Sequence, residues 1–102
     1  MNRDGVRAFA LSLPGAAEEP HFHFTSFRIE GRIFATMPPS NELLHVFVAE
    51  AEREAAIAAF PDCCEALHWG QRTVGVRVDL SRASRRLVED LLASAHAAKA
   101  RK

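Results

Sequence analysis

The segment FRIEGRIFA, Phe27 to Ala35, constrains the fold more than any other part of the chain. Glu30-Gly31 separates two short runs of alternating apolar and polar residues, and glycine adopts a positive φ at little cost. This pattern predicts a β-hairpin with a two-residue turn, in which Phe27 lies opposite Phe34 and both rings anchor the core. We therefore expect an antiparallel sheet.

The residues just before this hairpin alternate histidine and phenylalanine. In an extended strand, Phe22 and Phe24 would share one face, and His21 and His23 would share the other. The spacing of the large residues changes beyond Ser26, so either the strand begins near that residue or a bulge redirects it. We expect an irregular start to this strand.

Three further runs have the composition of strands. EALHW (65–69) and TVGVRVDL (73–80) flank a GQR turn and predict a second hairpin. In LLHVFVA (43–49) both faces are partly apolar, which leaves open the question of which face is buried. The two alternating sets are Leu44, Val46 and Val48 against His45 and Phe47.

Three segments show helical periodicity. Residues 50–60 begin with an acidic turn, stop before Pro61, and place Ile57 and Phe60 inward. The first helix ends at Pro14-Gly15 and has an apolar stripe of Val6, Phe9, Ala10 and Leu13. The last helix begins after Ser81 or Ser84, and its stripe is Leu87, Val88, Leu91, Leu92 and Ala95.

The elements follow one another in the order α-β-β-β-α-β-β-α. Hairpin-linked strands favour an antiparallel sheet, and the helices must bury their apolar stripes somewhere. We therefore predict an α+β fold of two layers, with the helices on one face of the sheet and the other face open. The length of 102 residues and the 48% apolar content fit one domain, 1–102, in which residues 99–102 form a frayed basic tail.

The net charge is zero, but it is unevenly spread. Residues 1–80 hold seven Lys and Arg against eleven Asp and Glu, which gives −4, and residues 81–102 hold six against two, which gives +4. Clustered positive charge attracts phosphate. The overall neutrality, however, excludes the strong field of a typical nucleic-acid binder.

The sequence predicts a cytoplasmic protein without membrane contact. It has no apolar run of about 18 residues, and Asp4 and Arg7 lie where the apolar core of a signal peptide would be. The two cysteines, Cys63 and Cys64, are adjacent. A disulfide between neighbours would be strained, so we expect reduced thiols, as in a reducing compartment.

Four segments in this order resemble the MmcQ/YjbR family of small bacterial proteins over nearly the whole chain: LPGAAEE, FRIEGRIFA, GVRVDL and LLASAHAAKA. The resemblance implies a fold like that of the frataxin-related CyaY proteins and the type III secretion chaperones. It also implies no enzymatic activity, and it brings the DNA-binding label that members often carry. The chain departs from the family where His68 runs directly into Trp69, without a His-x-Asn-Lys type segment. It departs again near His96, where members have a bulky aromatic residue followed by Ala-Pro-Lys.

Metal binding and catalysis have little support in the sequence. On one strand face, His21 and His23 would lie roughly 6 to 7 Å apart, within reach of one metal ion. A closed zinc site needs four ligands, usually with cysteine spacings that this sequence lacks, although His45, His68 or Cys63 could complete it. An iron-binding acidic ridge is missing from the first helix.

A cysteine nucleophile needs a lowered thiol pKa. The cysteine pair instead follows a helix C-terminus, where the helix dipole disfavours the thiolate. We expect surface histidines, packed cysteines, no cofactor and no enzymatic activity.

Basic residues gather on the last hairpin and at both ends of the last helix. The two ends of this helix lie about 25 Å apart. Trp69, and Phe47 if it lies on the open face, would stack on bases beside Arg77. The candidate nucleic-acid-binding residues are Arg72, Arg77, Arg82, Arg85, Arg86, Lys99, Arg101, Lys102 and Trp69.

Two alternatives remain open. In the first, Arg85 and Arg86 are neutralised by the acidic residues four positions later, Trp69 is part of the core and the tail is simply solvated. In the second, the open sheet face is a protein-interaction or chaperone-like surface that includes Phe47, Ile33 and Met37. The expected partner is thus weakly bound DNA or single-stranded nucleic acid, or a protein, and the chain is a monomer or weak dimer. Sensitivity to salt would distinguish phosphate binding from an apolar contact.

Overall fold

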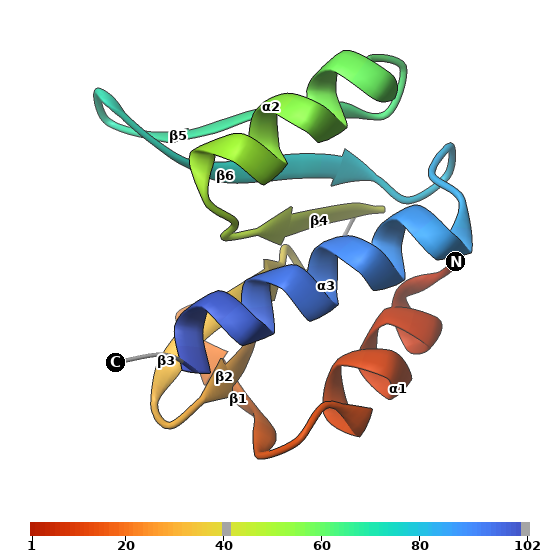
Figure 1. Ribbon diagram of the computed structural model, residues 1–102. Coiled ribbons are helices and arrows are strands. Elements are labelled where there is room, and N and C mark those ends of the chain that lie inside the picture. Colours follow the sequence, from red (N-terminus) through yellow and green to blue (C-terminus); the bar gives the residue numbers. More distant parts are fainter. Residues whose placement is uncertain (40–41, 101–102) are drawn as a thin grey trace.

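The computed structural model describes residues 1–39 and 42–100 (Figure 1). The elements within these ranges are α1 (Arg3–Ser12), β1 (Ala16–His21), β2 (Phe24–Ile29), β3 (Arg32–Met37), β4 (Leu43–Val46), α2 (Glu50–Ala59), β5 (Cys64–Trp69), β6 (Arg72–Asp79) and α3 (Arg85–Ala100). The predicted α+β class and the order of helices and strand groups are confirmed. The structure adds one strand, β1, to the first group.

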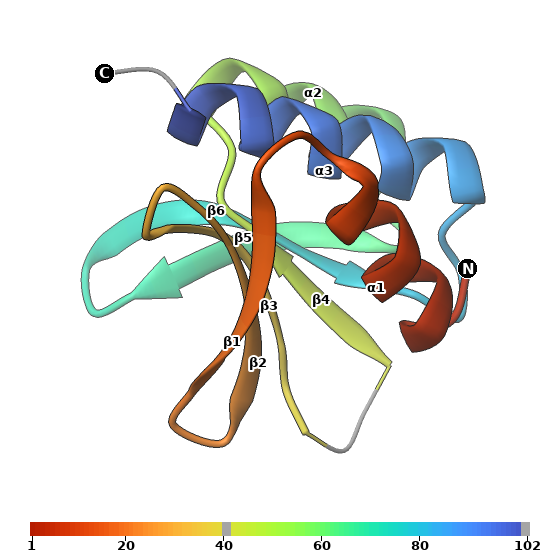
Figure 2. The same ribbon diagram turned by 90° about the horizontal axis from the view of Figure 1, so that it is seen from below.

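All strand pairs are antiparallel, and the sheet order is β1-β2-β3-β4-β6-β5. Figure 2 shows the three helices on one side of this twisted sheet, with no described helix on the other side. This arrangement confirms the predicted two layers. We call the uncovered side the open face.

The prediction that Phe22 and Phe24 share one face of a strand, with His21 and His23 on the other, was wrong. The chain reverses at Phe22-His23, so that β1 and β2 form a hairpin in which His21 pairs with Phe24. His21 therefore ends β1 while His23 lies in the turn, and the two histidines do not share a strand face. A two-residue alternation holds only along a continuous strand, and this segment is interrupted.

The Glu30-Gly31 turn is confirmed. Both residues have positive φ, 52° and 80°, which is the requirement for a tight hairpin turn of type I′. The predicted pairing was off by one residue, because Phe27 pairs with Ala35 and the register shifts between Phe27 and Arg28. Phe27 and Phe34 are nevertheless both fully buried, with ring centroids 6.5 Å apart.

The main core lies between the sheet and the helices, and α3 supplies much of it. Its predicted stripe is buried, together with Leu44 and Val46 of β4. Ser84 caps α3, because its Oγ accepts a hydrogen bond from the Leu87 backbone N–H at 3.1 Å. Its other end is tied to the segment after α1, since His96 Nε2 donates to the Pro14 carbonyl at 2.7 Å.

Two details at helix ends differ from the prediction. Phe60, expected to point inward from α2, is 44% exposed, and the helix instead buries Ala56 with Ile57 partly covered. Helix α3 continues through Lys99 to Ala100, whereas a frayed tail was expected from residue 99. Arg101 and Lys102 lie outside the described residues. No helix in the described ranges has the length and apolarity needed to cross a membrane.

A glycine in β6 allows β4 to cross very close to it. A Cβ built on Gly75 would lie 2.1 Å from the Val46 carbonyl oxygen and 3.0 Å from the Phe47 Cα, both of them backbone atoms. No side chain fits this space, so Gly75 lets the end of β4 approach and sets the position of Phe47.

We predict that Gly75→Ala lowers the free energy of unfolding by about 3 kcal/mol, because the backbone of β4 must move to admit the methyl group. Gly70→Ala is the matched control. Gly70 has φ of 61° but open space around its Cβ position, so the change should cost only about 1 kcal/mol. Urea denaturation of the two variants measures the difference, and equal losses would contradict the steric explanation.

Candidate nucleic-acid interface

The open face carries a second, smaller apolar cluster. Phe47 and Leu67 are buried, yet neither belongs to the main core between sheet and helices. Phe47 packs edge-on against Trp69, with ring centroids 5.2 Å apart. Trp69 itself remains 54% exposed, so the alternative that it is a core residue was wrong. Phe47 is a support for the Trp69 ring and not itself a stacking surface.

A row of polar side chains crosses the same face beside this cluster. Each member pairs with the next through its Cα register, from one sheet edge to the other: Glu19, Ser26, Thr36, His45, Arg77 and Glu65. Arg77 donates to Glu65 at 3.2 Å through Nη1, while its Nε is buried without a partner among the described residues. Ser26 and Thr36 are fully covered even though no described helix lies over them.

Three of the predicted nucleic-acid-binding residues meet in one hollow of about 340 Å³. Trp69, Arg72 and Lys99 line it together with Ile33, Phe47 and Val74, and we call it the hairpin hollow. Trp69 and Arg72 are paired residues of the β5–β6 hairpin, whereas Lys99 comes from the end of α3. Arg32 fixes that end, because its Nη1 donates to the Lys99 carbonyl at 2.9 Å.

The other basic candidates lie elsewhere and have acidic neighbours. At the start of α3, Arg82 lies 3.9 Å from Asp79, and the predicted pairs from Arg85 to Glu89 and from Arg86 to Asp90 are present, also at 3.9 Å. Three cations against three anions leave this end without net charge. In the hairpin hollow, by contrast, the lining holds two cations and no carboxylate. Arg72 and Lys99 form no ion pair within the described part of the chain.

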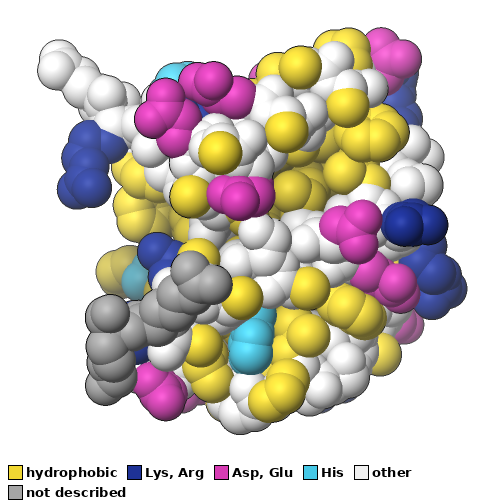
Figure 3. All heavy atoms as spheres, viewed as in Figure 1, with side chains coloured by type: hydrophobic (Ala, Val, Ile, Leu, Met, Phe, Trp, Pro, Cys, Tyr) yellow, Lys and Arg dark blue, Asp and Glu magenta, His cyan; other side chains and the backbone are white. Residues whose placement is uncertain are grey.

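Among the described residues, the helix-covered side of the molecule shows no cluster of basic side chains comparable to that in the hairpin hollow. Figure 3 shows that side, with Asp and Glu side chains scattered among hydrophobic ones and Lys and Arg side chains mainly toward the edges of the view. Met37, expected as a contact residue of the open face, belongs to the main core, because it is buried among the core residues on the helix side. Ile33 does line the hairpin hollow.

A second hollow of about 290 Å³ lies on the open face, and we call it the sheet-face hollow. Its ring-bearing lining residues are His21, Phe22, Phe24, His45, His68 and Trp69. Thr36, Leu67 and Arg77 complete it. Trp69 lines both this hollow and the hairpin hollow, so its ring stands between two concave surfaces.

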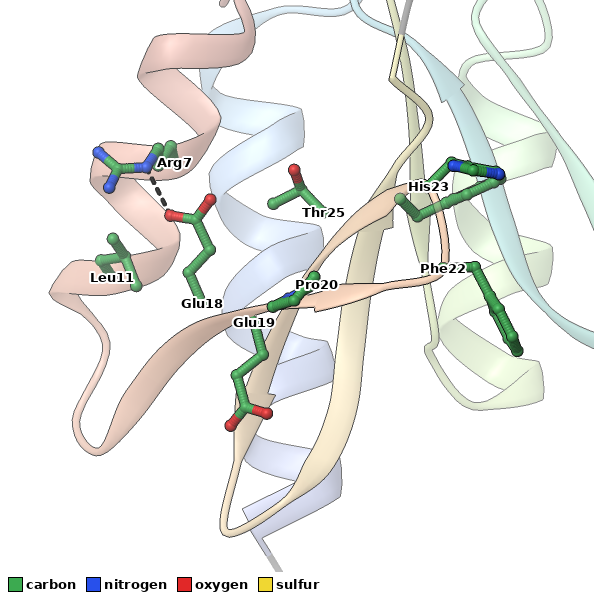
Figure 4. A pocket seen from close by; sticks show the side chains of 9 residues that line it. Arg7, Leu11, Glu18, Glu19, Pro20, Phe22, His23 and Thr25 are labelled. Atoms are coloured by element: carbon green, nitrogen blue, oxygen red, sulfur yellow. Dashed lines mark hydrogen bonds and ion pairs between the residues drawn. The ribbon is translucent and has the colours of Figure 1, made fainter.

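Phe22 is a site residue that sequence reasoning missed. It lies at the tip of the β1–β2 hairpin, where it lines both the sheet-face hollow and the hollow that Figure 4 shows with Arg7 and Glu18. Its ring is 89% exposed, and its φ of 58° lies in the left-handed region that favours glycine. The sequence offered no turn residue here, so no local signal marked the reversal.

The hollow drawn in Figure 4 has a volume of about 560 Å³ and lies between α1 and the β1–β2 hairpin. Arg7 forms an ion pair with Glu18, and Glu19 also lines the hollow. His23 lines this hollow while His21 lines the sheet-face hollow, so the two histidines serve different surfaces. Two carboxylates here make this hollow a poor phosphate site.

The cysteines are buried free thiols, with Sγ atoms 3.9 Å apart. Burial, with the neighbouring Cys63, raises the pKa of the Cys64 thiol to about 12. A thiol with so high a pKa is a poor nucleophile. His68, considered as its base, instead bonds to Thr73 through Nδ1 at 3.1 Å. Among the described residues, no three His, Cys, Asp or Glu side chains are grouped to hold a metal ion.

His45 has a lowered pKa, which makes stability depend on pH. Burial first, and the Arg77 charge second, lower the pKa of His45 below 6.5. As the pH falls below about 6.5, the unfolded chain takes up this proton before the folded protein does, so acid favours unfolding. We predict that the wild type loses more stability between about pH 7.5 and 5.5 than His45→Gln does. Urea denaturation at both pH values tests this, and equal losses would contradict it.

Comparison with known proteins gave one match. The family model described as YjbR matches residues 11–98, from the end of α1 to near the end of α3. No curated protein and no solved structure matched the chain. The match covers most of the chain and includes strands β1 to β6 and Trp69. The family resemblance read from the sequence is confirmed, and the chain belongs to the YjbR family.

Proposed function

We propose that this protein binds single-stranded nucleic acid through the hairpin hollow, as a binding module without catalytic activity. The observation that carries the proposal is the exposed Trp69 ring in one hollow with two cations, Arg72 and Lys99, and no carboxylate in the lining. Single strands are commonly held by aromatic rings that stack on bases and by cations that follow the backbone phosphates.

The support behind Trp69 favours this role. An exposed tryptophan on a flexible hairpin would lose much conformational freedom when a base stacks on it. Here Phe47 packs against the ring, with ring centroids 5.2 Å apart, and the Phe47 backbone lies close against Gly75. The ring is thus held in place with more than half of its surface still exposed.

The positions of the two cations suit a strand running past the ring. Arg72 is the register partner of Trp69, and Lys99 is held by the contact of its backbone carbonyl with Arg32. Because the net charge of the whole chain is zero, binding would be modest and confined to this local field. Buried cysteines without a disulfide fit a reducing compartment such as the cytoplasm.

We predict that a short labelled single-stranded DNA binds the wild type at about 50 mM salt and much more weakly at about 200 mM. The double variant Arg72→Ala/Lys99→Ala should weaken binding at least tenfold. It should also reduce the slope of log affinity against log salt by about 1.4, since each lost phosphate contact contributes about 0.7. Fluorescence anisotropy at several salt concentrations measures both quantities.

The matched control is Arg85→Ala/Arg86→Ala, which removes the same charge from the neutral start of α3. We expect it to bind within about twofold of the wild type, because exposed ion pairs contribute little. A larger loss in this control than in the hollow variant would move the interface to the start of α3. Absence of binding at low salt would overturn the nucleic-acid proposal and favour a protein partner on the open face.

A further inference from the structure

The conformation of Phe22 points to a role outside the fold. A bulky side chain seldom adopts φ near 58°, and glycine would hold the same turn without strain. The ring does not compensate by packing into the core, because it is 89% exposed. Its described ring contact is with the neighbouring His21, at 4.9 Å. Strained, exposed residues of this kind concentrate at functional sites.

Phe22 lies at the sheet-face hollow, and Trp69 lies at the same hollow on a different hairpin. The two most exposed large apolar side chains in the described part of the chain thus line one concave surface. At about 290 Å³, the hollow is at the lower limit for small-molecule pockets, which suits a single ring system.

The polar groups that line the sheet-face hollow indicate which kind of ring-shaped ligand it can bind. Its lining includes the cation Arg77 and no carboxylate, unlike the hollow beside α1 with its two glutamates. His45 and His68 have their Nδ1 atoms next to threonine hydroxyls, at 3.5 and 3.1 Å. The Nε2 atoms of these two histidines make no hydrogen bond with any described residue, so they can form hydrogen bonds with a ligand. Planar rings with several hydrogen-bonding edge atoms fit this environment, and nucleobases are such rings.

Trp69 lines both the sheet-face hollow and the hairpin hollow. We infer that the sheet-face hollow is a base pocket, in which one unpaired nucleobase lies against Phe22 and hydrogen-bonds to His45 and His68, next to the base stacked on Trp69. This inference rests on the proposed function, and it adds a source of base preference that phosphate contacts alone do not provide.

The variant Phe22→Gly separates binding from folding. Glycine suits the left-handed turn position, so the variant should fold with thermal stability equal to or above that of the wild type. Glu30→Gly is the matched control, because Glu30 has a similar φ of 52° in the other β2 hairpin and lies outside the lining of the hollow. Trp69 is the only tryptophan, so its intrinsic fluorescence reports on stacking directly.

The probes are short single strands made of adenine, cytosine or thymine alone, titrated at low salt. We expect the wild type to prefer one of these by about tenfold, and Phe22→Gly to lose about tenfold in affinity for it and most of the preference. Glu30→Gly should bind as the wild type does. Quenching of Trp69 fluorescence should persist in Phe22→Gly, because the hairpin hollow is intact.

Two other outcomes would overturn the inference in distinguishable ways. If Phe22→Gly keeps wild-type affinity and preference while Arg72→Ala/Lys99→Ala loses binding, the base pocket is wrong and the proposed function stands. If no strand binds the wild type or quenches Trp69 fluorescence at low salt, both proposals fail together.

Discussion

The three helices cover only one face of a six-stranded sheet, and the remaining features of the molecule follow from this constraint. The apolar stripe of α3 and the inward residues of β4 form one core on the covered side. The open face must then be protected from water by its own side chains. Phe47 packs against Trp69, Leu67 is buried on the same face, and Ser26 and Thr36 of the polar row are buried as well. A sheet face covered in this way is uneven, and its hollows are where a ligand can be held.

Local backbone geometry decides how that face is shaped. Gly75 permits the end of β4 to approach β6 so closely that Phe47 reaches the Trp69 ring. The register shift in β2 and β3 allows Phe34 and Ala35, neighbours in the sequence, both to be buried in the main core. Such irregularities redirect side chains without adding new elements. The candidate interface therefore depends on a few close backbone contacts more than on composition.

Charge acts locally in this protein. The chain is neutral as a whole, and most of its basic side chains stand beside a carboxylate, as at the start of α3. Only a small concentration of positive charge is then needed to define a phosphate-binding surface, provided that no anion shares it. Arg72 and Lys99 meet this condition because the end of α3 is held against the β2–β3 hairpin by Arg32.

The sequence by itself determined the elements whose signals are local. The stripe of α3, the two-residue turn at Glu30-Gly31 and the β5–β6 hairpin each depend on residues only a few positions apart, and each was predicted correctly. The reversal at Phe22 was not predicted, because a phenylalanine at a glycine-like φ is stabilised by the pairing of β1 with β2 and not by its own preference. Likewise, no spacing in the sequence brings Lys99 beside Trp69 and Arg72. Only tertiary packing decides such contacts, because the residues lie far apart in the sequence and no helix or strand periodicity relates their positions.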